Sequence, residues 1–173
     1  MFNKFLLLLI FLAALLRIAS ISNVPVFADE ANHLRIVDIV RSNPSFLLSS
    51  AHGGILPGLI ISLAVIETFF MKLFNVLIIS RLFSVIVDLL SAFFIYQIGS
   101  KLFNKNVAIC STLVYLSIQL NFFHARLVML EPQMQMFFLL AFLLFTKFNL
   151  ESVKRQRINL KTLYLIAMLI FLS

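Results

Sequence analysis

The chain has 173 residues, of which 62% are hydrophobic and only 12% charged, and its formal net charge is +7. A soluble domain cannot bury so much apolar surface, since ordinary chains are about half apolar and a quarter charged. The composition therefore predicts an integral, multi-pass membrane protein. Its basic residues lie in short connectors between apolar segments, so no nucleic acid is expected as a partner. The single cysteine, Cys110, lies in an apolar run, which argues against a disulfide or a cysteine metal site.

Five apolar segments are expected to cross the membrane as helices, because about 20 apolar residues span the hydrocarbon layer. These spans are 5–22, 76–99, 107–123, 132–148 and 162–173. The start of the chain also resembles a signal peptide, but Arg17 and the apolar run beyond it favour a retained anchor. The last segment is still apolar at Ser173, so we expect residues 1–173 to be one membrane domain from the N-terminal part of a longer protein.

The distribution of charged residues predicts on which side of the membrane each connector lies. The region before the first span, the connector with Lys101 and Lys105, and the strongly basic stretch 147–161 are all expected on the cytoplasmic side. The acidic connectors then face outward, and they contain Asp29, Glu30, Asp38 and Glu131.

One further apolar segment, 55–74, does not fit this order as a span. With the basic connectors inside, only one net crossing can lie between the first span and Lys101. The segment begins with glycines and a proline and carries Glu67 and Lys72. It is therefore expected to lie along the interface, which makes 23–75 an outer loop with interfacial helices. The alternative, a true span, would place the basic stretch 147–161 outside.

Asp29 and Glu30 lie a few residues after the first span. Two adjacent carboxylates at the end of a membrane helix are costly unless they have a function, and this position suits a general base or a cation ligand. The alternative is that they mark the water boundary and help to set topology. Beyond them, apolar and polar residues are spaced as in a short amphipathic helix, which 42–44 (Ser-Asn-Pro) would end.

Several polar residues from distant connectors are expected to meet at the outer face, which is how a polytopic enzyme builds a site. A divalent cation held by His124 with Glu131 and Asp29 is the one metal site considered, and three separate loops give it only a weak signal. No other cofactor is expected. Without a glycine-rich phosphate loop, direct use of a nucleotide sugar has no support. The residues that meet are Asp29, Glu30, His52, His124, Arg126 and Glu131.

The order of several short motifs resembles a known family. The motifs are Asp29-Glu30, His52-Gly53-Gly54-Ile55-Leu56-Pro57, Ser80-Arg81-Leu82-Phe83-Ser84, His124-Ala125-Arg126 and Leu130-Glu131-Pro132. Their order and spacing, over about residues 5 to 150, resemble the N-terminal part of the membrane glycosyltransferases of the protein O-mannosyltransferase and aminoarabinose-transferase type. The resemblance implies an all-α, polytopic transmembrane helix bundle of the GT-C type, with amphipathic juxtamembrane helices in the first outer loop.

The resemblance also implies an activity and roles for individual residues. The family transfers a sugar from a polyprenyl-phosphate carrier to an acceptor at the outer face, here expected to be that of a bacterial or archaeal plasma membrane. The acceptor is left open as a protein, a lipid or a glycan. By resemblance Asp29 is the catalytic base and Glu30 its supporting neighbour. Glu131 matches the second outer acidic position, where an aspartate is usual. Arg81 and Arg126 match recurrent arginines, which the resemblance implies bind the substrate or its phosphate.

The chemistry of such a transfer fits the residues present. A sugar on a lipid phosphate already carries a good leaving group, so the enzyme supplies a base, phosphate stabilisation and positioning. With Asp29 as the base, a single displacement inverts the anomeric centre and needs no carboxylate nucleophile. The candidate donors to the departing phosphate are Arg35, Arg126 and His52.

The alternative function is a non-enzymatic membrane transport protein with Asp29, Asp88 and Glu131 as ion or proton sites. A transporter places its main charges near mid-membrane in broken spans, whereas most charges here lie in outer connectors, which favours the transferase. Asp88 lies within the expected span 76–99 and should be paired or protonated there. Arg81 lies two turns away on a similar face, so a structural polar contact is expected.

Overall fold

The computed structural model describes residues 4–19, 21–48, 57–70 and 75–155. Within these ranges the chain is helical and contains no strand, so the predicted all-α class is confirmed. The helices are α1 (Lys4–Ile18), α2 (Ala28–Ser42), α3 (Pro57–Phe70), α4 (Val76–Leu102), α5 (Lys105–Ser117), α6 (Gln119–His124) and α7 (Glu131–Arg155), with 3-10 turns η1 (Ile21–Asn23) and η2 (Pro44–Leu48).

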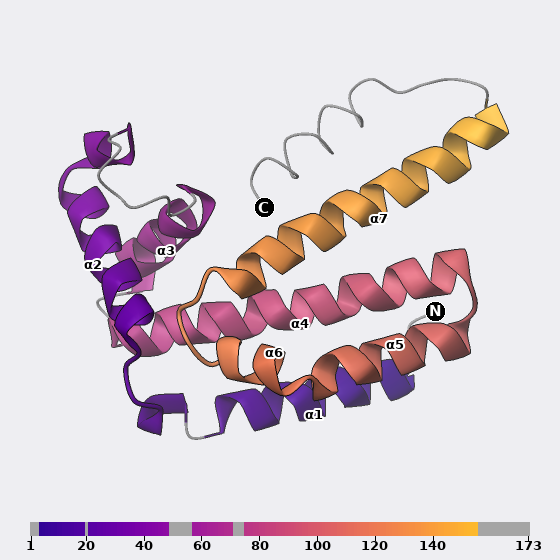
Figure 1. Cartoon of the computed structure of the whole chain (residues 1–173), viewed down its shortest axis with the longest axis horizontal. Helices are drawn as coiled ribbons and strands as arrows, with labels where there is room; N and C mark the ends of the chain where they lie inside the picture. The colour runs from indigo at the N-terminus through magenta and orange to yellow at the C-terminus, as the bar shows by residue number, and fades with distance from the viewer. Residues whose placement is uncertain (1–3, 20, 49–56, 71–74, 156–173) are drawn as a thin grey trace.

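The central helix is α4, against which α1, α3, α5 and α7 all pack (Figure 1). The C-terminal end of α1 lies near the start of α4, together with α2, α3, α6 and the segment 125–130 (Figure 1). We call this end of the bundle the α2 end. The opposite end, which we call the basic end, holds the start of α1 and the α4–α5 connection with Lys101 and Lys105 (Figure 1). The bundle therefore separates the basic connectors from the acidic ones.

Two described segments are long and apolar enough to cross a membrane, Lys4–Asn23 and Val76–Leu102. They coincide with the first two expected spans. The described part of α3 has 14 residues and is about 21 Å long, and the residues on either side of it lie outside the described ranges. The expected span 162–173 lies outside the described residues.

The segment expected to span at 107–123 is divided. The α5 helix ends at Ser117, Ile118 is extended, and α6 begins at Gln119. Neither glycine nor proline lies at this break, so nothing in the local sequence indicates it. The short α6 helix instead turns the chain into the segment 125–130, which leads to α7 (Figure 1).

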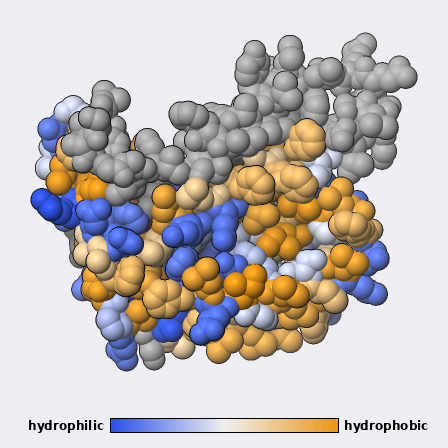
Figure 2. All heavy atoms as spheres, viewed as in Figure 1, coloured by the Kyte–Doolittle hydropathy of each residue, from blue (hydrophilic) through white to orange (hydrophobic). Residues whose placement is uncertain are grey.

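The surface agrees with a membrane environment around the bundle. Figure 2 shows hydrophobic residues over much of the middle of one face and hydrophilic residues gathered toward α2, α6 and the start of α7. Helix α1 alone exposes Phe5, Leu7, Leu8, Phe11, Leu12, Leu15, Leu16 and Ile18. Such a surface would be unfavourable in water but suits lipid.

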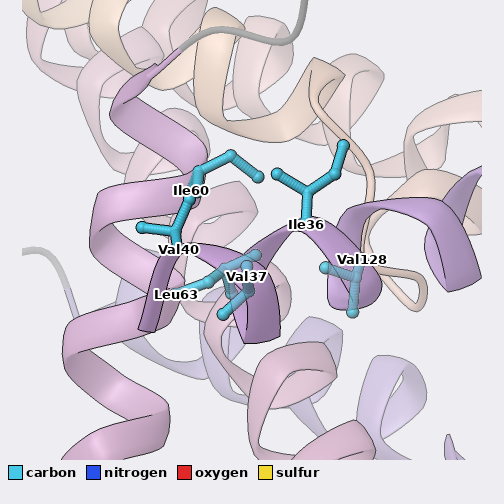
Figure 3. Close-up of a cluster of buried hydrophobic side chains, with 6 residues drawn as sticks. All are labelled: Ile36, Val37, Val40, Ile60, Leu63 and Val128. Carbon is cyan, nitrogen blue, oxygen red and sulfur yellow. The ribbon is translucent and has the colours of Figure 1, made fainter. Parts of the chain in front are cut away.

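A small apolar core fixes the α2 end. Buried side chains from α2 and α3 meet one from the segment 125–130 (Figure 3). This core holds α2 beside the connector between α6 and α7, so residues distant in sequence are brought together. Its members are Ile36, Val37, Val40, Ile60, Leu63 and Val128.

The α4–α5 connection packs unusually closely. Asn104 begins α5 by accepting a hydrogen bond from the Val107 backbone N–H at 2.9 Å. A Cβ atom added at Gly99 would lie 2.9 Å from the Ala108 Cα and 3.2 Å from the Ala108 Cβ. The two helices can approach this closely only because residue 99 has no side chain.

Gly99→Leu is expected to destabilise this hairpin by about 1–3 kcal/mol, because the obstructing atoms belong to backbone that cannot rotate away. Leucine has a higher helix propensity than glycine, but this gain is smaller than the cost of overpacking, so the variant should be less stable than the wild type. The measurement is thermal unfolding of the detergent-solubilised protein. Cys110→Ala, at an exposed position on α5, is the control and should melt like the wild type. Equal melting of both variants would contradict the close packing.

Candidate active site

The two adjacent carboxylates at the start of α2 lie in different environments. Glu30 is fully buried, and Asp29 is exposed. Helical geometry explains the difference, since successive side chains point about 100° apart around the axis. Glu30 shares a face with buried His33 and Val37, whereas Asp29 lies outside that face.

Glu30 forms a buried ion pair with Arg81 of α4. Arg81 Nε donates to Glu30 Oε1 at 2.8 Å and Arg81 Nη2 donates to Glu30 Oε2 at 2.6 Å, and both side chains have no exposed surface. Two parallel bonds of this kind are the strongest arrangement of an arginine with a carboxylate. The pair therefore fastens the first turn of α2 to the start of α4.

The remaining donors of Arg81 hold the chain between α1 and α2. Nη1 donates to the carbonyls of Ile21 at 2.8 Å and Val24 at 2.9 Å, and Nη2 lies 3.4 Å from the Pro25 carbonyl. A guanidinium has five N–H groups, and all five are used here. Arg81 was expected to contact phosphate, and this arrangement leaves it no donor for that role.

Helix α2 also holds the segment 125–130, because its side chains bind both the N–H and the carbonyl of Val128. Glu30 Oε1 accepts from the Val128 N–H at 3.0 Å. His33 Nδ1 lies 2.8 Å from the Val128 carbonyl, to which the Nδ1–H tautomer donates. The sequence did not single out His33 as part of the site. Its spacing of three residues from Glu30, on one helix face, is the signal that would have indicated this role.

Asp29 has no hydrogen bond or ion pair within the part of the chain that the structure describes. Its carboxylate lies in the first turn of α2, where unpaired backbone N–H groups give the helix a partial positive charge. Because Glu30 fixes the backbone beside it, Asp29 is presented to the surroundings from a rigid turn. This combination of exposure and support suits a proton acceptor.

Arg126 lies at the same end of the bundle. Its Nη2 donates to the Ala19 carbonyl at 2.7 Å, and its guanidinium carbon lies 5.3 Å from the centre of the Phe122 ring. Its Nε is buried and has no hydrogen-bond partner among the described residues. The side chain is thus anchored at the C-terminal end of α1 while part of its donor capacity is unused.

The other expected site residues are placed unevenly. His124 Nδ1 and Glu131 Oε2 are 3.9 Å apart, and they form an ion pair when the imidazole is protonated. No group of three or more potential metal ligands is found within the described ranges, so the structure brings together His124 and Glu131 but not a complete cation site. Arg35 is exposed on α2. His52 lies outside the described residues.

Asp88 is paired, but with a residue other than the one that sequence spacing suggested. Its Oδ2 accepts from Arg17 Nε at 2.7 Å, and its Oδ1 accepts from the Tyr115 hydroxyl at 2.8 Å. Arg81 is not the partner because Glu30 and three backbone carbonyls use all its donors. The fold brings α1 alongside α4, and spacing within α4 could not reveal this.

A third buried carboxylate lies on α3. Glu67 accepts from the Ser80 hydroxyl at 2.8 Å and lies 3.6 Å from Arg41 Nη1. Burial raises the pKa of Glu67 above its ordinary value near 4.5, and the Ser80 hydrogen bond and Arg41 only partly oppose this effect. The neighbouring Asp38 carboxylate raises the pKa slightly further.

Glu67→Gln is therefore expected to stabilise the protein at pH 7 to 8 and to change little at acidic pH. A folded-state pKa raised above the unfolded value means that stability falls as pH rises between the two values, and glutamine mimics the protonated form. Melting temperatures across this pH range measure the effect. For the control Thr68→Val, at an exposed position on α3, the difference in melting temperature from the wild type should not change with pH. A Glu67→Gln variant that is least stable at high pH would contradict the assignment.

Comparison with known proteins adds a family to this geometry. The family model of the dolichyl-phosphate-mannose-protein mannosyltransferases matches residues 54–173, more than half of the chain. No curated protein and no solved structure matches the chain. The matched range includes Arg81, Arg126 and Glu131, whereas Asp29 and Glu30 precede it. The match confirms the resemblance seen in the motif order and favours a membrane-integral glycosyltransferase over a transport protein. The chain belongs to the dolichyl-phosphate-mannose-protein mannosyltransferase family.

Proposed function

We propose that this chain carries the catalytic base of a glycosyltransferase that moves a sugar from a polyprenyl phosphate to an acceptor at the outer face of the membrane. The observation that carries the proposal is the contrast at the start of α2. Glu30 is locked by Arg81 and Val128, and Asp29 beside it is exposed and unpaired within the described residues. Family membership supports a lipid-phosphate donor.

Asp29 acts as the general base in a single displacement. It takes the proton from the acceptor hydroxyl while that oxygen forms a bond to the anomeric carbon. The bond from this carbon to the phosphate oxygen breaks at the same time, and the polyprenyl phosphate leaves with the electron pair. One displacement inverts the anomeric configuration, since no glycosyl-enzyme intermediate is formed.

Arg126 stabilises the departing phosphate. Its position at the C-terminal end of α1 and its partial exposure support this role. A charge-assisted hydrogen bond to phosphate strengthens as negative charge develops on the leaving oxygen. Exposed Arg35 is a second candidate donor from α2, and His52 is a third candidate from the outer loop.

Glu131 and His124 form the second polar part of the proposed site. Glu131 is in the first turn of α7 and is about half exposed, which leaves it accessible to an acceptor. His124 contacts it when protonated and would orient it. A divalent cation at this pair would need further ligands from the acceptor, from water or from elsewhere in the chain.

The donor class and the stereochemical course can be tested together. Membranes containing the full natural protein would be given polyprenyl phosphates or nucleotides that carry the same labelled sugar, first mannose. Transfer from the polyprenyl phosphate alone, with the anomeric configuration of the product inverted by NMR, is the expected result. A product with retained configuration, or transfer from the nucleotide sugar without a lipid intermediate, would contradict the proposal.

A further inference from the structure

A second buried ion pair lies between α1 and α4, and the proposed mechanism does not use it. Arg17 and Asp88 are 2% and 1% exposed, and their closest N–O distance is 2.7 Å. The Tyr115 hydroxyl of α5 bonds to the other Asp88 oxygen and also lies 3.1 Å from Gln135 Oε1 of α7. The Asp88 carboxylate of α4 therefore links this helix to α1 and α5, and the Tyr115 hydroxyl also contacts α7.

Stability alone gives a poor account of this pair. Moving two charges out of water into a buried site is expensive, and well-packed apolar residues often stabilise a protein as much or more. Ionisable groups within membrane-spanning helices are by default associated with function. Arg17 Nη2 is buried and has no hydrogen-bond partner in the described part of the chain, so the pair does not fully satisfy the guanidinium.

The pair is connected to Arg126 through one aromatic ring. The guanidinium carbon of Arg17 lies 5.6 Å from the centre of the Phe122 ring, and that of Arg126 lies 5.3 Å from the same point. Arg126 also donates to the carbonyl of Ala19, which follows Arg17 by two residues. Both contacts of Arg126 thus depend on Arg17. One is with the Phe122 ring, which Arg17 also contacts, and the other is with the C-terminal end of α1, which Arg17 anchors.

Charge explains why Asp88 is needed in this arrangement. Two guanidinium groups against one ring repel each other, and a low-dielectric environment strengthens that repulsion. The Asp88 carboxylate neutralises Arg17, whereas Arg126 forms no ion pair with another described residue. It also fixes Arg17 through a charge-assisted hydrogen bond at 2.7 Å.

We propose that Asp88 and Arg17 are positioning residues for Arg126. Asp88 fixes Arg17, and Arg17 fixes Phe122 and the C-terminal end of α1. These two elements then present the Arg126 guanidinium to the phosphate of a polyprenyl-phosphate ligand. Neither Asp88 nor Arg17 touches the reacting atoms. The inference rests on the proposed role of Arg126 at the leaving phosphate.

Direct binding of polyprenyl phosphate without a sugar tests the inference separately from catalysis. The full natural protein would be placed in lipid nanodiscs and titrated with this ligand. Asp88→Asn keeps the size of the side chain and an acceptor for Tyr115 but removes the charge. It is expected to raise the Kd about tenfold, the loss of roughly one charged hydrogen bond. The KM for the glycosylated donor should rise similarly, with a smaller change in kcat.

A double-mutant cycle distinguishes positioning from a general structural effect. If Asp88 acts through Arg126, Asp88→Asn should weaken binding much less in an Arg126→Gln background than in the wild type. The double variant Arg17→Met with Asp88→Leu removes both charges together, so it guards against misfolding of the single variant. It should fold, yet bind polyprenyl phosphate weakly. Thr112→Val is the matched control, because it removes a buried hydroxyl that donates to the Ala108 carbonyl and to no other described residue.

The outcomes separate this inference from the proposed function. Weaker binding in both charge-removing variants, and little further loss in the Arg126→Gln background, would support positioning. Folded variants that bind polyprenyl phosphate as tightly as the wild type would overturn the inference alone. Equal loss in the wild-type and Arg126→Gln backgrounds would also overturn it. A wild-type protein that does not bind polyprenyl phosphate would overturn the proposed function and the inference with it.

Discussion

Asp29→Asn is expected to reduce sugar transfer by about 10²- to 10⁴-fold, the usual contribution of a general base, without lowering stability. Asparagine has nearly the same shape as aspartate but cannot accept the proton from the acceptor hydroxyl. The side chain is exposed and forms no hydrogen bond with another described residue, so its replacement should leave the packing of α2 intact. Transfer from a labelled polyprenyl-phosphate sugar measures the effect, and thermal melting provides the control.

The conservative variant Asp29→Glu sharpens this expectation. Glutamate retains the base but extends it by one methylene, so part of the activity should remain. Transfer activity that falls from the wild type to Asp29→Glu and further to Asp29→Asn would indicate a proton acceptor at this position. Equal activity of the asparagine variant and the wild type would remove Asp29 from the mechanism.

Arg81→Met is expected to destabilise the protein by about 3–5 kcal/mol, the usual effect of removing one partner of a buried ion pair. The substitution leaves the Glu30 carboxylate buried without its counter-charge and removes the donors to the carbonyls of residues 21–25. The α2 end should loosen as a unit, and transfer should fall with it. Melting and limited proteolysis of residues 19–30 would measure this.

A comparison with another cation separates this effect from loss of charge. Lys105→Gln removes an exposed positive charge at the basic end and should melt within about 0.5 kcal/mol of the wild type, as surface changes usually do. If Arg81→Met melts like Lys105→Gln but loses binding of polyprenyl phosphate, Arg81 would be a phosphate ligand, as the sequence resemblance suggested. The structural role assigned here to Arg81, as the partner of Glu30 that fastens α2 to α4, would then be wrong.

The helical class of the fold could be predicted from sequence because composition and segment length determine it. The α2 helix was equally predictable, since its apolar spacing and the Ser-Asn-Pro stop are local signals. The apolar part of its buried face follows from the same spacing. The burial of Glu30 and His33 on that face does not, because their partners Arg81 and Val128 are distant in sequence.

Long-range pairing is the part of the site that sequence could not provide. Asp88 has Arg81 at a suitable spacing on its own helix, but its partner Arg17 is 71 residues away on α1. Adjacency in sequence likewise does not tell which of Asp29 and Glu30 is buried, and only tertiary packing distinguishes the two. The break at Ile118 has no local signal, because neither glycine nor proline lies there.

The most direct test of the account compares Asp29→Asn and Glu30→Gln in the same membranes, with transfer and thermal melting measured for both. We expect Asp29→Asn to lose transfer and keep the wild-type melting temperature. Glu30→Gln should melt at a lower temperature, because it leaves Arg81 as a buried charge without a counter-charge. An Asp29→Asn variant that transfers sugar normally would contradict the central claim that these adjacent carboxylates divide catalysis and support between them.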